Sequence, residues 1–442
     1  MQRRLNILIL HAIDDFARIR QSTLRHILAL QRYAPQHRYY YQNIRAHATP
    51  HLQAIPFDLI VLDASFLCWR WVRPRHHFEE AKARYGWLAA SDAVKAAFPQ
   101  DDYDHAAILD DWLADYRVQM IYSICAEHHD ILYPRNHRRA VIKSVLTGYI
   151  DADDIALYGG YRRPFAERFY DAGYRVRALP PWFGSFGLLK SDFGRAFAKA
   201  ADGVLRFSIS DRPEATLTGK EWPNFLGDCR YALGSEGGSD IIDADGSKRE
   251  ACEIFMKKNP RAAPRDVIAA VLPDDGQYVF AMPTPRLFEI AMAGCCPILL
   301  EGDYFGWLTP ELHYLAVRRD FSNIPDLIAR LDDHEAAQSM ARRFHDALLT
   351  RPELHYDRHV AGLFADVAPM LGPRATGQLD DSQFAAAIAA HHHEAQKRLG
   401  HDAPMFPHLL KQPPPPVTKT VNKHQDSGYN PASQTRRTVD AA

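Results

Sequence analysis

Short apolar runs alternate with helical patterns along most of the chain, and this alternation limits the folds open to it. Residues 5–10 form an apolar run interrupted only by Asn6, residues 59–62 form a continuous one, and the mostly apolar residues 118–124 (VQMIYSI) are a further strand candidate. A continuous run of this length is typical of a strand that is buried on both faces, as in a parallel sheet. Between the first two runs, residues 14–33 carry apolar side chains at helical spacing. Strands that alternate with helices predict an α/β, doubly wound architecture with a parallel sheet.

The same pattern appears twice along the 442 residues, which is long enough for two or three domains. The first series adds strands at 154–158 and 174–179, and the segment from Pro180 to Gly187, rich in Pro and Gly, predicts a linker. The second series has strands at 204–209, 231–233, 297–300 and 314–317, with helices at 248–256, 285–293 and 324–331. We therefore predict two Rossmann-like domains, 1–185 and 186–372, a terminal helix in 373–400 and a disordered tail, 401–442. Open sheets of this kind bind ligands at the carboxyl ends of their strands, so the site should lie in the cleft between the domains.

Composition excludes several classes of function. Lys and Arg number 53 against 54 Asp and Glu, a balance that argues against a dedicated nucleic-acid binder. The six cysteines contain no C-x-x-C pair, which favours reduced thiols and a cytoplasmic protein. No apolar run approaches the roughly 20 residues of a membrane span, and residues 5–10 are too short for a secretory signal. Peripheral contact with a membrane surface stays open.

The segment 282–300, MPTPRLFEIAMAGCCPILL, carries the most specific pattern. Thr284 is a good N-cap, Pro285 fits the first helical position, and Gly294 fits the position just past the helix end. The free N–H groups at the start of such a helix suit an anion such as phosphate. Glu289 could accept hydrogen bonds from a vicinal diol such as a ribose. Alternatively, Arg286 and Glu289, three residues apart, form only a surface ion pair.

This segment also resembles a known family. The stretch 284–289 (TPRLFE), followed by 293–298 (AGCCPI), is similar to a motif of GT-B glycosyltransferases, closest to the CgeB-like spore-maturation group. The resemblance continues through 308–312, 320–331 and 355–358, so it covers roughly residues 200–365. It implies a GT-B fold, a nucleotide-sugar donor and a ribose-binding role for Glu289. Retaining members with two Glu eight residues apart would need the first at Ala281, so the stereochemical outcome stays open.

A second group of candidates would bind the donor diphosphate. The resemblance implies that basic residues in this part of the chain, here Arg206 and Lys220, neutralise this group, which leaves as an anion. Gly237 and Gly238 follow a predicted strand, where backbone without side chains can approach phosphates. A pair of glycines is also common in simple turns.

A third group lies at the carboxyl end of the strand predicted at 118–124. Glu127, His128 and Asp130 offer carboxylate and imidazole groups there, which suit a general base for an acceptor hydroxyl. A hydrogen-bonded loop without catalytic function is the alternative. Asp63 and Ser65, after the 59–62 strand, could line the acceptor side.

No metal site is predicted, because no three or four spaced ligands converge in the sequence. Asp243-Ala244-Asp245 matches an Asp-x-Asp pattern by letter, but Gly246 after it indicates a turn. We therefore expect a metal-independent glycosyltransferase with no cofactor beyond its nucleotide-diphosphate sugar, acting on a hydroxyl of a glycan, lipid or protein. A nucleotide-sugar epimerase, and an assembly protein that kept the fold without the chemistry, are the alternatives.

Overall fold

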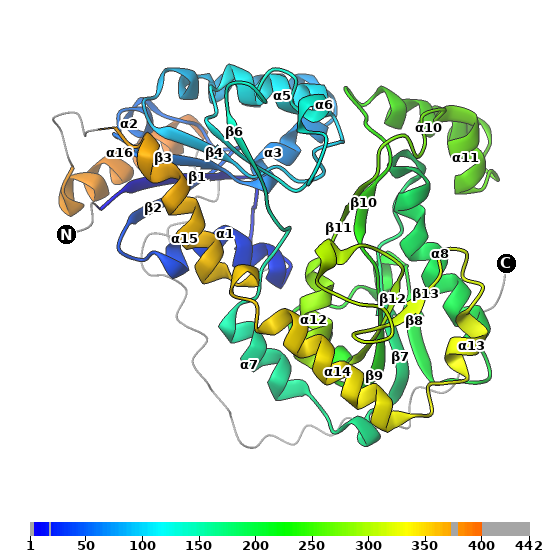
Figure 1. Ribbon diagram of the computed structural model, residues 1–442. Coiled ribbons are helices and arrows are strands. Elements are labelled where there is room, and N and C mark those ends of the chain that lie inside the picture. Colours follow the sequence, from blue (N-terminus) through cyan, green and yellow to red (C-terminus); the bar gives the residue numbers. More distant parts are fainter. Residues whose placement is uncertain (1–3, 17–18, 373–378, 400–442) are drawn as a thin grey trace.

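A computed structural model of the chain describes residues 4–16, 19–372 and 379–399. Two α/β domains, each built on a parallel sheet, lie beside each other (Figure 1), and a cavity lies between them. This is the α/β fold class, with two doubly wound Rossmann-like domains, that the sequence predicts. The predicted tail, 401–442, lies outside the described residues.

The first sheet has six parallel strands in the order β2-β1-β3-β4-β5-β6. Their bounds are β1 Asn6–His11, β2 Arg38–Asn43, β3 Leu59–Leu62, β4 Val94–Ala97, β5 Met120–Ser123 and β6 Val141–Ser144. The strand order reverses between β1 and β3, which makes the crevice beyond their carboxyl ends the expected ligand site of this domain. The accompanying helices are α1 Gln21–Tyr33, α2 Pro50–Gln53, α3 Ala64–Leu67, α4 His76–Arg84, α5 Ala106–Asp115 and α6 His129–Leu132.

The second sheet has five parallel strands in the order β13-β12-β9-β7-β8. Their bounds are β7 Tyr170–Arg175, β8 Phe207–Ser210, β9 Cys229–Gly234, β12 Cys296–Leu300 and β13 Leu315–Val317. Here the order reverses between β7 and β9. A short two-stranded antiparallel sheet, β10 (Gly237–Ser239) with β11 (Phe280–Met282), follows β9 and faces the first domain. The helices of this half are α7 Ala152–Tyr161, α8 Gly184–Ala201, α9 Glu221–Gly227, α10 Ser247–Lys258, α11 Pro264–Val271, α12 Pro285–Ala293, α13 Ile324–Ile328 and α14 His334–Leu349.

The chain crosses between the domains twice, and the two crossings lie side by side. The first follows β6, and the second precedes α15 (Tyr356–Val367). Ile150 N–H donates to the Leu354 carbonyl (2.7 Å), and Tyr356 N–H donates to the Ile150 carbonyl (3.1 Å). After the second crossing, α15 packs against α1, and α16 (Asp381–Leu399) packs against α2. The end of the described chain therefore belongs to the first domain.

The sheets divide the chain differently from the predicted boundary at residue 185. Residues 174–179 were expected in the first sheet, whereas β7 pairs with β8 and β9 in the second. Residues 154–158 were expected to form a strand but lie in α7, whose N-cap Asp151 accepts a hydrogen bond from Asp153 N–H (2.8 Å). The expected linker at 180–187 leads directly into α8 of the second domain. A short apolar run cannot by itself distinguish strand from helix, nor say which sheet a strand joins.

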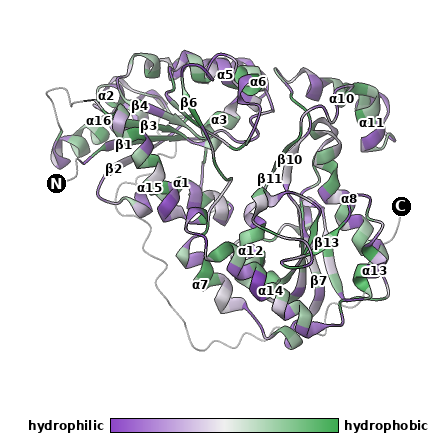
Figure 2. Ribbon diagram, in the orientation of Figure 1, coloured by the Kyte–Doolittle hydropathy of each residue, from purple (hydrophilic) through white to green (hydrophobic). Residues whose placement is uncertain are grey.

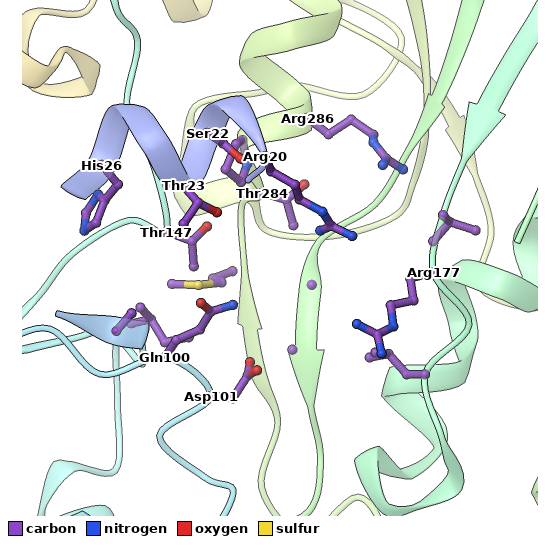
Figure 3. A pocket seen from close by; sticks show the side chains of 18 of the residues that line it. Arg20, Ser22, Thr23, His26, Gln100, Asp101, Thr147, Arg177, Thr284 and Arg286 are labelled. Carbon is purple, nitrogen blue, oxygen red and sulfur yellow. The ribbon is translucent and has the colours of Figure 1, made fainter. Parts of the chain in front are cut away.

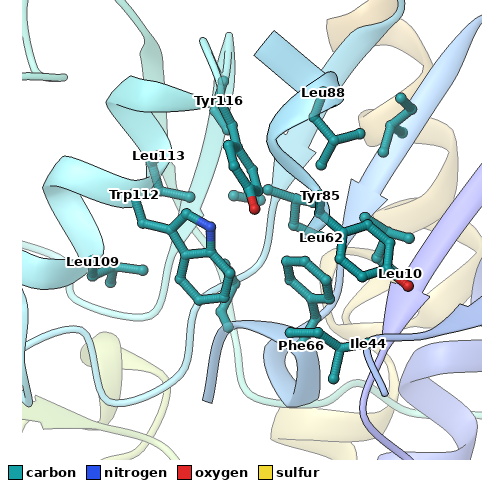
Figure 4. Packing of buried hydrophobic residues seen from close by; sticks show 14 of the residues in the cluster. Leu10, Ile44, Leu62, Phe66, Tyr85, Leu88, Leu109, Trp112, Leu113 and Tyr116 are labelled. Carbon is teal, nitrogen blue, oxygen red and sulfur yellow. The ribbon is translucent and has the colours of Figure 1, made fainter. Parts of the chain in front are cut away.

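Alternate residues of the strands pack into separate cores on the two faces of each sheet. In the first domain, Leu10 and Leu62 pack with Phe66 of α3 and Trp112 of α5, whose rings stack at 5.2 Å (Figure 4). The opposite face packs against α1 and α15. In the second domain α12, largely hydrophobic in Figure 2, is buried on one face of the sheet, while α8 and α13 cover the other. No helix in the described part of the chain is long and apolar enough to cross a membrane.

The contact of α16 with the first domain depends on a neutral histidine. His391 is buried, with Nδ1 at 2.8 Å from Thr49 Oγ1 and Nε2 at 3.0 Å from Gln42 Oε1. Burial, followed by the nearby His392 and His51, lowers the pKa of His391 to about 4. A folded-state pKa below the unfolded value of about 6.5 means that this group stabilises the fold above pH 6.5 and loses that contribution as the pH falls toward 4.

We therefore expect the free energy of unfolding to fall by up to about 3 kcal/mol between pH 6.5 and 4 through His391 alone. His391→Gln, which keeps an amide toward Thr49 and Gln42 but does not titrate, should flatten this part of the pH profile. Denaturant unfolding at several pH values measures it. His393→Gln, at an exposed position on the same helix, is the matched control and should keep the wild-type profile. Equal profiles for all three proteins would contradict the assignment.

Candidate functional site

A cavity of about 930 Å³ lies between the domains, at the carboxyl ends of both sheets. The segments after the reversal points of both sheets line it. They include Ala12 after β1 and Asp63 after β3 from the first domain, and Arg177 after β7 and Glu236 after β9 from the second. The topology thus places the cavity where open α/β sheets bind ligands. Asp63 and Ser65, predicted to lie on the acceptor side, are among its lining residues.

Helix α12 brings the most specific sequence pattern to this cavity. Thr284, Arg286 and Glu289 all line it. Thr284 occupies the N-cap position, but its side chain makes no capping hydrogen bond. Gly294 ends the helix in the left-handed conformation (φ 64°), as the sequence predicts.

Glu289 is partly buried and already has donors from two other elements. The Trp222 indole N–H donates to Glu289 Oε2 (2.9 Å), and the Tyr158 hydroxyl faces the same carboxylate. Burial raises the pKa of Glu289, while Arg286, Trp222 and Tyr158 act in the opposite direction. The interaction with Arg286 is electrostatic, and the structure records no direct ion pair between them.

Arg286 is held between two aromatic rings. Its guanidinium carbon lies 5.3 Å from the centroid of the Tyr174 ring and 5.3 Å from that of the Trp222 ring. Its Nε is buried and has no hydrogen-bond partner. A buried N–H without an acceptor is energetically costly, so this arginine is prepared for a ligand that brings one.

Arg286 belongs to a cluster of four cations, which we call the cation cluster: Arg20, Arg177, Lys190 and Arg286. All four line the cavity, and the guanidinium groups of Arg20 and Arg177 point into the same gap (Figure 3). Among the described residues, none of the four forms a side-chain ion pair. Like charges held together without direct ion pairs favour binding of an anion.

The pKa of Lys190, on α8, is affected by the other three cations of the cluster. Burial and then Arg286, Arg177 and Arg20 lower its pKa to about 8, and Asp101 of the first domain partly offsets them. A lysine with a pKa of about 8 is still largely a cation at neutral pH but loses its proton just above it.

We expect the affinity for nucleoside diphosphates to fall as the pH rises from 7 to 9.5, with a midpoint near pH 8 in the free protein. The last ionisation of a phosphate has a pKa of about 6, so the charge of the ligand changes little over this range and the decline reports mainly the protein. Lys190→Arg should abolish the decline, because an arginine stays charged throughout. Calorimetric titrations at five pH values measure it. A decline of the same size in Lys190→Arg would assign the titration to another group.

Two glycines line the cavity from the β10 strand. A Cβ on Gly238 (φ 141°) would lie 1.7 Å from the Phe280 carbonyl oxygen, so pairing with β11 requires glycine there. A Cβ on Gly237 would lie 2.9 Å from Thr284 Cγ2. Packing therefore accounts for both glycines, and their bare backbone still borders the cavity.

Arg206 and Lys220 are not among the lining residues. Arg206 precedes β8, at the amino end of the sheet, and its guanidinium carbon lies 4.5 Å from the centroid of the Phe169 ring. The carboxyl ends of the strands border the cavity, so a residue at an amino end faces away from it. Lys220 precedes α9, whose Trp222 does line the cavity. Neither residue predicted to bind the diphosphate therefore lines the cavity, whereas Arg177, Lys190 and Arg286 do.

The loop with Glu127, His128 and Asp130 lies next to the cavity, but these three residues do not line it. Cys125 at the start of the loop does. The Glu127 side chain is 81% exposed, and the His128 ring packs 5.0 Å from the Tyr278 ring. Their catalytic role stays a prediction, and the geometry directs attention to acidic groups inside the cavity.

Five residues that line the cavity carry no pattern that predicts them from sequence: Arg20, Arg177, Lys190, Asp101 and His26. Arg177 follows β7 and could have been found had that strand been placed in the second sheet. Asp101 follows β4, a strand that the analysis did not identify. Lys190 lies in the second turn of a long helix, where nothing in the sequence distinguishes it from a surface lysine.

One group of described residues has the composition of a metal site: Asp104, His105 and Asp243. The protein itself supplies hydrogen-bond partners for these three residues. His105 Nδ1 lies 2.6 Å from Asp104 Oδ1, and Asp243 accepts hydrogen bonds from Gly246 N–H (2.9 Å) and Arg249 N–H (3.0 Å). Asp245 accepts from Ser247 N–H (3.0 Å). The segment 243–245 thus forms the turn before α10 that the sequence indicates.

No family model matches the sequence, and no curated protein does. Solved structures resemble the fold at low identity. A glycosyltransferase from Rickettsia africae ESF-5 is 7% identical, with a TM-score of 0.48 over 84% of this chain and 100% of that one. Anabaena Alr3699/HepE in complex with UDP and glucose is 9% identical (TM-score 0.46; 83% and 100%). An alpha-glucosyltransferase in complex with UDP and a 13-mer DNA is 7% identical, with a TM-score of 0.46 over 83% of this chain and 100% of that one. Likeness at this level carries no information about substrates or site residues.

Proposed function

We propose that this protein is a glycosyltransferase that moves a sugar from a nucleotide-diphosphate donor to a hydroxyl acceptor in glycan or polysaccharide biosynthesis. The observation that carries the proposal is the cation cluster beside Glu289, at the carboxyl ends of the second sheet. A diphosphate needs several cations in one place, and a ribose needs a carboxylate nearby. Both are present on one side of one cavity.

The donor would bind the second domain, with its diphosphate at Lys190, Arg177 and Arg286 and its ribose at Glu289. Stabilising the negative charge that develops on the departing diphosphate is the main contribution these cations can make. The acceptor would enter from the first domain, past Asp63 and Ser65. Holding both substrates in one enclosed cavity converts an encounter of two molecules into a reaction within one complex.

Residues from both domains would have to approach a bound donor. Arg20 precedes α1 of the first domain, yet it influences the pKa of Lys190 and Glu289 in the second. An anion bound at the cation cluster would therefore draw Arg20, and with it the first domain, toward the donor. This electrostatic link supports a transferase in which donor binding closes the cavity and excludes water.

A thermal-shift screen against nucleoside diphosphates and their sugars tests donor binding, because a ligand of the folded state raises the melting temperature. Transfer assays follow, with glycan, lipid, protein and nucleic-acid acceptors. Nucleic acid is included because its exclusion rests on net charge alone. Donor conversion without an acceptor would identify an epimerase, and binding without transfer or hydrolysis would identify an assembly protein. No stabilisation by any diphosphate would refute the proposal.

We expect transfer activity to survive chelation of metal ions. The cation cluster supplies the positive charge that a divalent metal would otherwise bring to the diphosphate. Transfer rates measured with EDTA should equal those in untreated enzyme. Complete loss in EDTA, restored by Mn²⁺, would contradict this expectation and direct attention to Asp104, His105 and Asp243.

The proposal includes a glycan, lipid or protein as the acceptor and the cytoplasm as the location. The six cysteines are all free thiols, four of them fully buried in apolar cores, which supports a cytoplasmic location.

A further inference from the structure

Asp101 stands on the acceptor side of the cavity, opposite the donor-binding residues. It lies in the loop after β4 of the first domain and lines the cavity. Figure 3 shows its carboxylate directed toward the gap that Arg20 and Arg177 also face. Lys190 of the second domain lines the same cavity, and Lys190 and Asp101 each influence the pKa of the other across the domain boundary. Asp101 is thus an acceptor-domain carboxylate beside the place where a donor diphosphate would leave.

The loop that carries Asp101 is held in an unusual conformation. Asp101 has a φ of 52° and His105 a φ of 55°, in the left-handed region that side chains other than glycine rarely adopt. Such residues persist where surrounding contacts fix them, and they concentrate at functional sites.

The contact that fixes this loop is a buried arginine. The Arg70 side chain, only 1% exposed, donates to the carbonyls of Gln100 (2.8 Å), Asp101 (2.9 Å) and Asp104 (2.9 Å). Three hydrogen bonds from one guanidinium to one loop define the position of its backbone. The Tyr103 hydroxyl then donates to Asp101 Oδ1 (2.7 Å) and orients the carboxylate.

The other acidic residues of the cavity are placed less well for chemistry on an acceptor. Asp63 caps α3, where its Oδ1 accepts from Ser65 N–H (2.8 Å). Asp104 pairs with His105, and Glu236 and Glu289 belong to the donor domain. Among these groups, Asp101 alone combines the acceptor domain with proximity to Lys190.

We propose that Asp101 is the general base that accepts the proton of the acceptor hydroxyl, and that the transfer inverts the anomeric configuration. This inference rests on the proposed function. The hydroxyl oxygen forms its bond to the anomeric carbon while the bond from that carbon to the diphosphate oxygen breaks. The electron pair leaves with the diphosphate, toward the cation cluster, and the hydroxyl proton passes to Asp101. If the hydroxyl, with Asp101 as its base, attacks the anomeric carbon opposite the departing diphosphate, the transfer is a single displacement, and a single displacement of this kind inverts.

The electrostatics of Asp101 are compatible with this role. Burial raises its pKa from the usual value, while Tyr103, Arg70 and Lys190 oppose that rise. A carboxylate of raised pKa is a stronger base than an exposed one.

Asp101→Asn tests the assignment. Asparagine tolerates the left-handed backbone and can still accept from Tyr103, so the melting temperature should be unchanged. The turnover number should fall by roughly 10²- to 10⁴-fold, and Asp101→Glu should recover part of it. Donor affinity, measured at pH 7, should change little in either variant. NMR of the first-formed product gives the anomeric configuration, for which inversion is expected.

Two outcomes would overturn the inference: full turnover in Asp101→Asn, or a product that retains the donor's configuration. Loss of turnover in His128→Asn but not in Asp101→Asn would return the base to the 127–130 loop. Because Asp101→Asn also removes a charge near Lys190, the comparison is repeated in a Lys190→Arg background, where the cation cannot titrate. Wild-type protein that transfers no sugar at all would instead refute the proposed function, so the two failures are distinguishable.

Discussion

Arg286→Ala is expected to weaken nucleoside-diphosphate binding by roughly 10²- to 10⁴-fold. Two charge-assisted hydrogen bonds to the diphosphate, each of about 1.5–3 kcal/mol, account for this range. The structure supports a large effect because Arg286 is fixed between Tyr174 and Trp222, and its buried Nε has no partner without a ligand. Calorimetric titration with the best nucleotide of the thermal-shift screen measures it.

Arg206 offers a matched control. It is also an arginine over an aromatic ring, Phe169, but it lies at the amino end of the second sheet. Arg206→Ala should therefore bind nucleotide as wild type does. Arg286→Lys, which keeps the charge but loses the planar fork, should recover only part of the affinity. Equal affinity in wild type and Arg286→Ala would show that the diphosphate does not bind at this cluster.

The structure confirms the parts of the fold that local patterns determine. The helix predicted at 285–293 has these bounds, because Pro285 can only begin a helix and Gly294 adopts the left-handed conformation that ends one. The continuous apolar runs at 59–62 and 297–300 form buried strands of parallel sheets. This agrees with the prediction that a continuous apolar run is buried on both faces of a sheet. In these segments the backbone preference, the side-chain pattern and the burial agree.

What the sequence could not supply is the pairing of distant segments. Nothing in residues 170–175 shows that this strand pairs with β8 and β9 rather than with the first sheet. The same holds for α15, which returns from the second domain to pack against α1. Long-range pairing decides which domain a segment joins, and a single sequence contains no direct record of it.

In the candidate site, too, residues on one segment could be predicted from sequence, whereas residues from distant segments could not. Thr284, Arg286 and Glu289 were found because one helix carries all three at a recognisable spacing. Arg20, Lys190 and Asp101 come from three separate elements of both domains, so they converge only once the fold brings β4, α8 and the start of α1 together. Arg206 was predicted because it is basic and near a strand, but a strand's amino end is the wrong end for this cavity.

The prediction for Glu289 separates ribose binding from a structural role. If its carboxylate accepts hydrogen bonds from the ribose hydroxyls, Glu289→Ala loses one or two charge-assisted bonds of about 1.5–3 kcal/mol each. Affinity for the nucleotide should then fall roughly ten- to hundredfold or more, with the fold intact. Glu289→Gln keeps an acceptor for the Trp222 indole but loses the charge, so its affinity should lie between those of wild type and Glu289→Ala.

Glu289→Ala could also weaken binding indirectly, because Trp222 and Arg286 lose a neighbour. Ligands that lack one ribose hydroxyl separate this indirect effect from the loss of ribose binding. Each protein is titrated with the nucleoside diphosphate and with its 2′-deoxy and 3′-deoxy forms. Wild type should discriminate against the deoxy forms, and Glu289→Ala should bind all three about equally. Such coupling between one side chain and one hydroxyl arises only if they interact in the complex. Unchanged discrimination in a well-folded Glu289→Ala would instead leave Glu289 with Trp222, Tyr158 and Arg286 as its only partners, and the ribose would have to bind elsewhere in the cavity.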